Sequence, residues 1–143
     1  MNWEIDFSPL PVYIRVETEG TISLGEHRVL WDEILSSKQW TPGMCVLIKA
    51  DTIPPSGVEG YRVTKAAARY FVERDAEIGR SCIAVVRADP QNYYHSRQFQ
   101  YAIQLRGSSV VVRNFTNEAT AVSWFENVRL HEDARASAAD HIN

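Results

Sequence analysis

The stretch Met44-Cys-Val-Leu-Ile-Lys-Ala50 decides how this chain folds. It is apolar with little alternation, as a central strand covered on both faces is. Three other strand-like runs, residues 12–16, 83–86 and 110–112, also precede segments with a helical apolar pattern. Strands that alternate with helices specify a parallel sheet covered by helices. The sequence therefore predicts an α/β fold with a mostly parallel sheet, an N-terminal edge strand and about four helices.

Length and composition point to one folded domain. The chain has 143 residues, of which 45% are hydrophobic and 23% charged, as in ordinary globular proteins. We expect this domain to span residues 1–129 and a polar, frayed tail to span residues 130–143. The net charge of -3 argues against a whole-surface attraction to nucleic acid or to an anionic membrane.

Neither a signal peptide nor an apolar run of roughly 18 residues is found in the sequence. We therefore expect a cytoplasmic protein that does not insert into a membrane. Cys45 and Cys82 each lie at the start of a predicted strand, with no Cys or His nearby that would suggest a metal site. Two buried, reduced thiols are expected, and a disulfide between neighbouring strands is the alternative. No cofactor and no metal are predicted.

The first helix is expected after two strands. Residues 3–7 form the predicted edge strand, and apolar and polar side chains alternate in residues 12–16, as in a half-buried strand. Ser23 and Glu26 form a Ser-x-x-Glu capping box, which predicts that a helix opens there. Its apolar stripe comprises Leu24, His27, Leu30, Trp31, Ile34 and Leu35.

The longest irregular connection is expected at residues 51–57, between a strand and its helix. Ser56 and Glu59 form a second capping box, so the next helix is expected to start there and to continue to about Ile78. Gly79 is the predicted helix stop.

The limits of the last two helices are also predicted. Asp89-Pro90 places a capping residue before a proline at the first helical position, and this helix is expected to end at about Leu105, with Leu105 buried. Gly107 then stops it. Thr116 is the predicted cap of the final helix, which is expected to end at about Val128.

This order of elements resembles the STAS-like fold of the anti-sigma-factor antagonists and of a related uncharacterised bacterial family. The resemblance covers roughly residues 3–128. It rests on the strand of residues 13–21 that leads into a capped helix, and on the apolar strand that ends in Asp51. The closing Val110-Val-Val-Arg-Asn-Phe and Asn117-Glu-Ala-Thr-Ala-Val-Ser-Trp-Phe look much like the strand and helix that end the uncharacterised members. A superhelical (βα)n arrangement is implied.

In the anti-sigma-factor antagonists, the loop after the equivalent strand carries an Asp-Ser-Ser/Thr-Gly motif whose hydroxyl residue is phosphorylated to control partner binding. The matching stretch here is Asp51-Thr-Ile-Pro-Pro-Ser-Gly57, which keeps an Asp, two hydroxyl residues and a Gly but not their spacing. The resemblance implies Ser56 and Thr52 as phospho-acceptors beside a partner surface that includes Asp51, Pro55 and Gly57. Helix capping explains Ser56 as well, so both interpretations stay open.

A ligand site is expected beyond the carboxyl ends of the strands, as in other open parallel sheets. The polar residues at these ends are Asp51, Thr52, Arg87, Asp89, Arg113 and Asn114. Topology predicts that they converge, and the two arginines would suit an anion. The structural alternative is that Asp89 is a cap and that both arginines are solvated or paired charges.

The histidines do not form a catalytic arrangement. His27 and His95 lie near apolar helix faces, where a structural histidine is expected, and His131 and His141 belong to the tail.

Two surface features have simple explanations and functional alternatives. Arg62, Lys65 and Arg69 form a basic flank, which is usually a solvated face paired with acidic residues one turn away. Tyr93, Tyr94 and Tyr101 could stack a base, but their helical spacing places two of them in the core.

These observations favour a non-enzymatic STAS-like module that binds a protein partner and has a regulatory role in a bacterial-type cytoplasm. A small-ligand or lipid carrier is the alternative, because the STAS-like arrangement is similar to that of lipid-transfer domains. An enzyme ranks third, because no acid–base pair or activated nucleophile can be named. A homodimer through the N-terminal edge strand is a further prediction, although Pro9 and Pro11 protect that edge.

Overall fold

The computed structural model describes the backbone of residues 1–53, 55 and 57–142, and the side chains of these residues except 90–96, 99 and 132–142. Its elements are β1 (Asn2–Asp6), β2 (Ile14–Thr21), α1 (Glu26–Ser36), β3 (Val46–Ile53), α2 (Gly57–Glu73), α3 (Asp75–Ile78), β4 (Cys82–Val86), α4 (Pro90–Leu105), β5 (Val111–Phe115) and α5 (Glu118–Ile142). The strands form one sheet in the order β1-β2-β3-β4-β5. β1 is antiparallel to β2, and the other neighbours are parallel. The predicted α/β class and mostly parallel sheet are confirmed.

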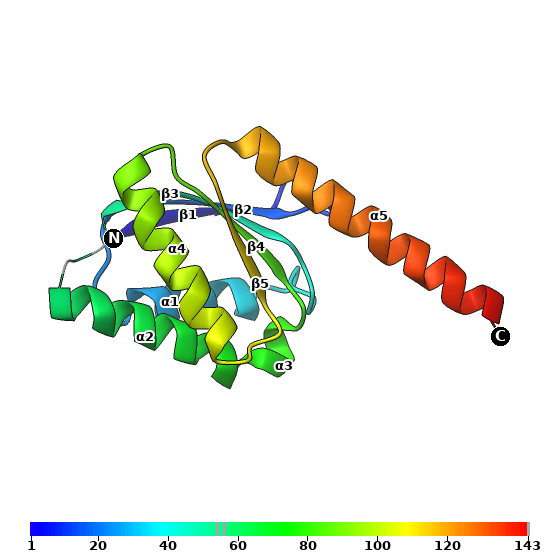
Figure 1. Cartoon of the computed structure of the whole chain (residues 1–143), viewed down its shortest axis with the longest axis horizontal. Coiled ribbons are helices and arrows are strands. Elements are labelled where there is room, and N and C mark those ends of the chain that lie inside the picture. Colours follow the sequence, from blue (N-terminus) through cyan, green and yellow to red (C-terminus); the bar gives the residue numbers. More distant parts are fainter. Residues whose placement is uncertain (54, 56, 143) are drawn as a thin grey trace.

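Two unequal helical layers cover the sheet. The larger core lies between one face of the sheet and side chains from α1, α2 and α4, among them Trp31, Phe71 and Ile103. On the other face, Ala121 and Phe125 of α5 pack against Leu47, Ala84 and neighbouring residues. Figure 1 shows α1, α2 and α4 together on one side of the sheet and α5 on the other.

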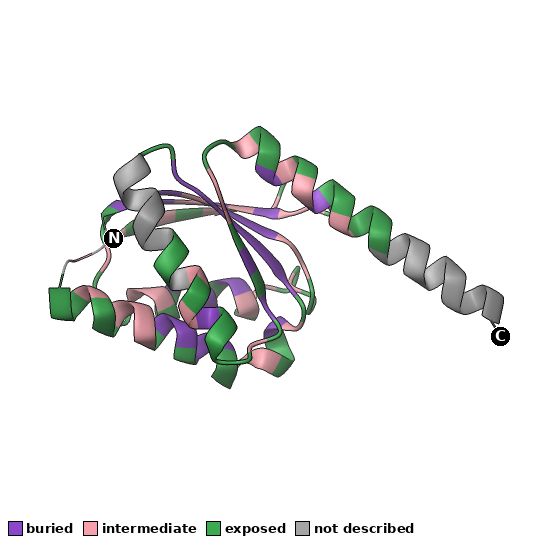
Figure 2. Cartoon of the chain, viewed as in Figure 1, coloured by how far each residue is buried: buried purple, intermediate pink, exposed green. Residues whose placement is uncertain are grey.

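Strand β4 is buried because both of its faces are covered. Every residue of β4 is buried, and Figure 2 shows buried residues concentrated along the inner strands and on the helix surfaces that face them. Side chains alternate between the two layers along each strand. In β4, Ile83 and Val85 belong to the larger core, whereas Ala84 and Val86 belong to the smaller one. The prediction of buried central strands is confirmed for β4, whereas only half of the residues of β3 are buried.

Strand β3 is longer at its carboxyl end than the sequence predicts. Asp51, Thr52 and Ile53 are strand residues that pair with Glu19, Gly20 and Thr21 of β2. The irregular connection expected at residues 51–57 is therefore shorter, and α2 begins at Gly57.

The expected capping box of α1 is only half formed. The backbone N–H and the hydroxyl of Ser23 both donate to a carboxylate oxygen of Glu26, but α1 begins at Glu26 and Gly25 is its N-cap. The helix therefore starts later than predicted. The second carboxylate oxygen of Glu26 is 2.8 Å from the amino group of Met1, so this side chain ties the chain start to α1.

The helix predicted to run to Ile78 is divided. Helix α2 ends at Glu73, and the short helix α3 follows and ends at Ile78, with Gly79, at a φ of 68°, as its C-cap. Because of this division, the part of the chain that the structure describes has five helices. The predicted stop at Gly79 is confirmed, since a positive φ favours glycine.

The limits of the last two helices differ in part from the prediction. Helix α4 begins at Pro90 as expected, but Leu105 is 88% exposed rather than buried. The side-chain oxygen of Asn117, not that of Thr116, accepts a hydrogen bond from the Thr120 N–H at 3.0 Å. Helix α5 continues to Ile142, so the chain after Val128 is helical where we expected a frayed tail.

Arg15 connects the sheet to α5. Its guanidinium donates to both carboxylate oxygens of Glu118, at 2.6 and 3.3 Å, and lies 2.9 Å from Glu17. These contacts hold the start of α5 against β2. Further along α5, the ring centroids of Phe125 and Tyr13 are 5.6 Å apart.

Both cysteines are thiols, and Cys82 is buried as predicted, but Cys45 is only half-buried. Among the described residues, no helix has the length and apolar character needed to cross a membrane.

Substitution of Gly79 by alanine tests the tight passage from α3 to β4. At Gly79 a Cβ would lie 3.2 Å from both the Gly43 nitrogen and the Pro42 Cβ, whereas at Gly107, which has a φ of 78°, it would meet no atom within 4 Å. Gly107→Ala should lower the free energy of unfolding by about 1–2 kcal/mol through backbone strain alone. Gly79→Ala should lower it further, as measured by urea denaturation. If both variants lose the same free energy of unfolding, the crowding expected at Gly79 does not destabilise the protein.

Candidate functional site

A hollow of about 500 Å³, partly open to the surface, lies between the sheet and the α1, α2 and α4 layer. Its walls are formed by one face of β3 and β4 and by side chains of the three helices. The apolar part of the wall includes Leu30, Trp31, Ile48, Phe71, Ile83 and Val85, and the polar part includes Thr18, Thr52, Thr64, Arg87 and Gln98. We call this space the cavity.

Small residues create the cavity. Ala50 and Thr52 occupy successive inward positions on β3, while Gly60 and Ala67 stand opposite on α2 and Ala102 stands on α4. Native interiors are packed nearly as densely as organic crystals, so a space of this size at the centre of the helical layer is a distinct feature of the fold.

Gly60 brings the chain segment after β3 close to α2. A Cβ at this position would overlap the carbonyl oxygen of Pro55, so only glycine allows this approach. Pro55, Gly57 and Gly60 all border the cavity. Tyr61, also on the wall, is 66% exposed, which marks where the cavity meets the surface.

Arg87 provides the charged end of the cavity. It follows β4 in the same alternating series as Ile83 and Val85 and is only 7% exposed. Its Nη1 donates to the Thr52 carbonyl at 2.7 Å, and its Nη2 donates to the Thr52 hydroxyl at 3.3 Å. Burial lowers the pKa of Arg87, while the charges of Asp51 and Asp89 oppose this shift. The guanidinium is therefore held at the strand end of the cavity.

Two nitrogen-bearing rings of α1 form part of the cavity wall. Trp31 is fully buried, and within the described part of the chain its indole N–H has no hydrogen-bond partner. His27 packs edge-on against Phe71 and Tyr70, with ring centroids 5.2 and 5.9 Å away. Burial lowers the pKa of His27 to about 4, so this imidazole is neutral at pH 7.

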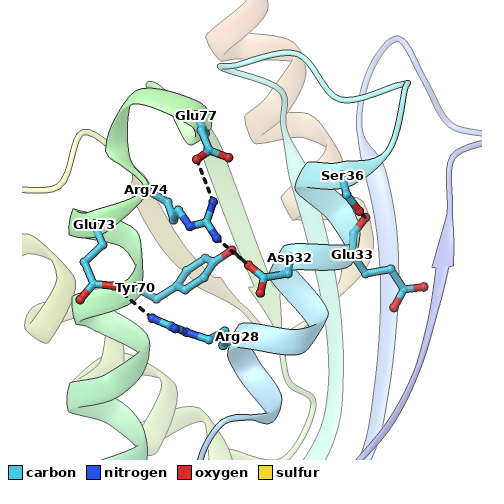
Figure 3. Close-up of polar contacts among 8 residues, drawn as sticks. All are labelled: Arg28, Asp32, Glu33, Ser36, Tyr70, Glu73, Arg74 and Glu77. Carbon is cyan, nitrogen blue, oxygen red and sulfur yellow. Dashed lines mark hydrogen bonds and ion pairs between the residues drawn. The ribbon is translucent and has the colours of Figure 1, made fainter.

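A polar network fixes the spacing of α1 and α2 (Figure 3). The hydroxyl of Tyr70 donates to Asp32 at 2.6 Å, and Arg74 donates to the same carboxylate oxygen at 3.3 Å. Arg28 pairs with Glu73 at 3.1 Å. Burial and the Asp32 carboxylate raise the pKa of Tyr70, so its hydroxyl keeps the proton that it donates. The two helices are thus held together by side chains that lie outside the cavity wall.

The structure does not bring together all the residues expected to converge at the strand ends. Thr52 and Arg87 meet at the cavity. Arg113 is exposed, and its guanidinium lies 5.5 Å from the ring of Trp124 on the α5 side of the sheet. Asp51 alternates with Thr52 and is also exposed, as is Asp89. The predicted pocket with two arginines is therefore wrong in composition, because one arginine lies on each face.

The structure describes only one of the two implied phospho-acceptors, Thr52. Thr52 is 2% exposed and its hydroxyl accepts the bond from Arg87, so a kinase would reach it only after the fold opens. Ser56 lies outside the described residues. Pro55 is half-buried and Gly57 is exposed.

Two of the acidic residues expected to pair with the basic flank of α2 have other partners. Lys65 lies over the Tyr61 ring at 5.9 Å, whereas Glu73 pairs with Arg28 and Glu77 with Arg74. Tyr101 is 52% exposed and accepts a hydrogen bond from Arg97 at 2.9 Å. The side chains of Tyr93, Tyr94 and His95 lie outside the description.

The sequence did not single out most of the cavity wall. Gly60, Ala67 and Ala102 are small residues with no chemical signature, and Trp31 was assigned to the core stripe. The available signal was the strand period of two, which places Thr52 and Arg87 on one face and Asp51 on the other.

The chain was compared with known proteins. No family model, no curated protein and no solved structure matches it.

Among the described residues, no group of three or more His, Cys, Asp or Glu side chains is placed to hold a metal ion.

The low pKa of His27 predicts a pH-dependent stability. Between pH 6.5 and about 4 the unfolded chain protonates His27 while the folded protein keeps it neutral, so the free energy of unfolding should fall as the pH falls. The slope should approach about 1.4 kcal/mol per pH unit. Urea denaturation between about pH 6.5 and 5 avoids most carboxylate titration.

The His27→Phe variant is the control, because phenylalanine keeps the ring contacts and does not titrate. The variant should lack the His27 contribution to the slope over this range. If wild type and variant lose stability in parallel, His27 is not held neutral by burial.

Proposed function

We propose that this protein binds a small, mostly apolar molecule in the cavity and does so without catalysing a reaction. The cavity itself is the observation that carries this proposal. Its volume of about 500 Å³ lies within the roughly 300–1,000 Å³ of typical ligand sites. Its wall combines a large apolar area with a few polar groups, which is the usual composition of such sites.

The surroundings of the cavity support a preformed site. The Asp32, Tyr70 and Arg74 contacts hold α1 against α2, and Arg87 ties the end of β4 to β3. A site that keeps its shape without ligand loses less conformational entropy on binding. The cavity is thus suited to selective binding rather than to loose adsorption.

Two neighbouring alanines of α2 offer a matched test of the cavity. Ala67 lines the cavity, whereas Ala68 is fully buried in the packed core and is not part of the wall. Ala67→Leu should leave stability unchanged or raise it by up to about 2 kcal/mol, because the added carbons enter empty space. Ala68→Leu should lower stability by about 1–3 kcal/mol through overpacking. Denaturant unfolding measures both.

Native mass spectrometry of protein purified from its own source tests the binding function directly. A small molecule retained by the wild type, released on denaturation and lost in Ala67→Leu would support the proposal. Equal destabilisation by both leucines, with no retained molecule and no uptake of apolar probes, would contradict it.

A STAS-like regulatory module that binds a protein partner is the second candidate, and a group of exposed apolar side chains favours it. Ile53, Val58 and Tyr61 are 60%, 71% and 66% exposed, and all three flank or follow residues 54–56. Exposed apolar groups concentrated in one segment are typical of interaction sites. The resemblance to anti-sigma-factor antagonists places a regulated partner surface in the same segment, and it supports a cytoplasmic setting.

Ser56→Asp tests this second function. The added carboxylate should weaken or strengthen association with a partner isolated by affinity capture at least about fivefold, with the melting temperature kept within a few degrees. Ser123→Asp, at an exposed position on α5, is the control and should change neither quantity. Unaltered association in Ser56→Asp would remove the support for regulation at this residue.

A further inference from the structure

Trp31 carries a donor that the protein does not use. Its side chain is fully buried, and among the described residues its indole N–H has no hydrogen-bond partner. By contrast, the indole N–H of Trp3 donates to Glu33 at 2.8 Å. That of Trp40 donates to the Glu77 carbonyl at 2.9 Å. Buried polar groups nearly always have a partner, so the donor of Trp31 calls for an explanation.

Trp31 belongs to the wall of the cavity, on the side formed by α1. Its ring centroid is 5.1 Å from that of Phe71 and 6.3 Å from that of His27, and both of these rings also border the cavity. A molecule that packs against these three rings lies beside the indole. A ligand in the cavity is thus placed to supply the missing acceptor.

The guanidinium of Arg87 does not require an anionic ligand. It donates to the carbonyl and the hydroxyl of Thr52, and the negative charges of Asp51 and Asp89 favour its charged form. The protein itself supplies interactions for this charge, so the ligand need not.

The chemistry of the wall restricts the kind of acceptor that the ligand carries. An indole N–H is a donor only, so its partner is an acceptor such as an oxygen. The wall is mostly apolar and includes Leu30, Phe71 and Ile83. Moving an ion into apolar surroundings costs far more than moving a neutral oxygen. The acceptor that suits this wall is therefore uncharged.

Resting on the proposed binding function, we propose that the ligand is an uncharged, mostly hydrocarbon molecule with an oxygen that accepts a hydrogen bond from the indole N–H of Trp31. A ketone, an ester and an ether share this chemistry. The hydrocarbon part covers the apolar wall, while the oxygen gives the donor of Trp31 its partner. A pure hydrocarbon would leave this donor unpaired, so the cavity selects for the oxygen.

Two probes of nearly the same shape separate the oxygen from the hydrocarbon. They are benzophenone, a ketone, and its analogue in which a methylene group replaces the carbonyl oxygen. Calorimetric titration should show that the ketone binds the wild type about three to ten times more tightly, as the net contribution of a neutral hydrogen bond predicts.

Proton–nitrogen correlation NMR observes the donor itself. The chain has four tryptophans, and the indole resonance of Trp31 is assigned through its contacts with the protons of Phe71. Benzophenone should move this resonance downfield, because a hydrogen-bonded proton is deshielded, and the methylene analogue should not. The ring currents of the two probes are alike, so the difference between them reports the hydrogen bond.

Two tryptophan variants locate the preference. Trp31→Phe removes the donor and keeps an aromatic ring in the wall, so it should bring the two probes to similar affinities. Trp40→Phe is the matched control, because Trp40 packs edge-on against Trp31 with ring centroids 6.5 Å apart but its N–H already has a partner. This variant should keep the preference of the wild type. If Trp31→Phe does not fold, the shift of the Trp31 resonance in the wild type still decides the matter.

The failures of the two proposals are distinguishable. If the wild type binds both probes equally well, or if Trp31→Phe keeps the preference for the ketone, the role of Trp31 is wrong and the binding function stands. If neither probe binds the wild type, the inference about Trp31 fails. If, in addition, Ala67→Leu destabilises as much as Ala68→Leu, the binding function fails with it.

Discussion

The fold depends on the alternation of side chains along β3 and β4, whose two faces are both covered. In β3, Val46, Ile48 and Ala50 turn toward α1, α2 and α4, whereas Leu47 turns toward α5. Parallel strands require crossover connections, which here supply the helices that cover the sheet. The same alternation assigns every polar residue at the strand ends to one layer or the other, so it also decides which groups form the site.

The volume of the cavity has an energetic consequence. An empty apolar cavity costs about 24 cal/mol per Å³ in a protein core, so 500 Å³ of dry space would cost roughly 12 kcal/mol. That is comparable to the whole stability of a typical domain, about 5–15 kcal/mol. Because the cavity is partly open, water can enter it, but apolar walls hold water poorly. A hydrocarbon occupant would bury the same walls favourably.

Much of the fold could be predicted from short-range patterns. The run of residues 44–50 specified a covered strand, Pro90 marked the start of α4, and Gly79 marked the end of a helix. These signals are local, since they depend on backbone preferences and on the period of apolar residues. The extension of β3 to Ile53 was missed because it depends on pairing with Thr21 of β2, a contact between segments far apart in the sequence.

The site was harder to predict than the fold, for a related reason. The sequence identified Arg87 and Thr52 but also placed Arg113 with them, because it considered which end of the sheet each residue reaches and not which face. The cavity has no sequence signal of its own. It exists because Gly60, Ala67 and Ala102, on two different helices, leave the same space unfilled.

The two candidate functions share one segment of the chain. Pro55 and Gly57 border the cavity, while Ile53 and Val58, on either side of them, are exposed. A ligand in the cavity and a partner bound to the exposed side chains would therefore act on the same few residues. If either one shifts the segment, thermodynamic linkage requires the other to bind with altered affinity, and by the same factor in both directions. The two proposed functions are thus compatible on this fold, because ligand occupancy would offer a physical route to partner control.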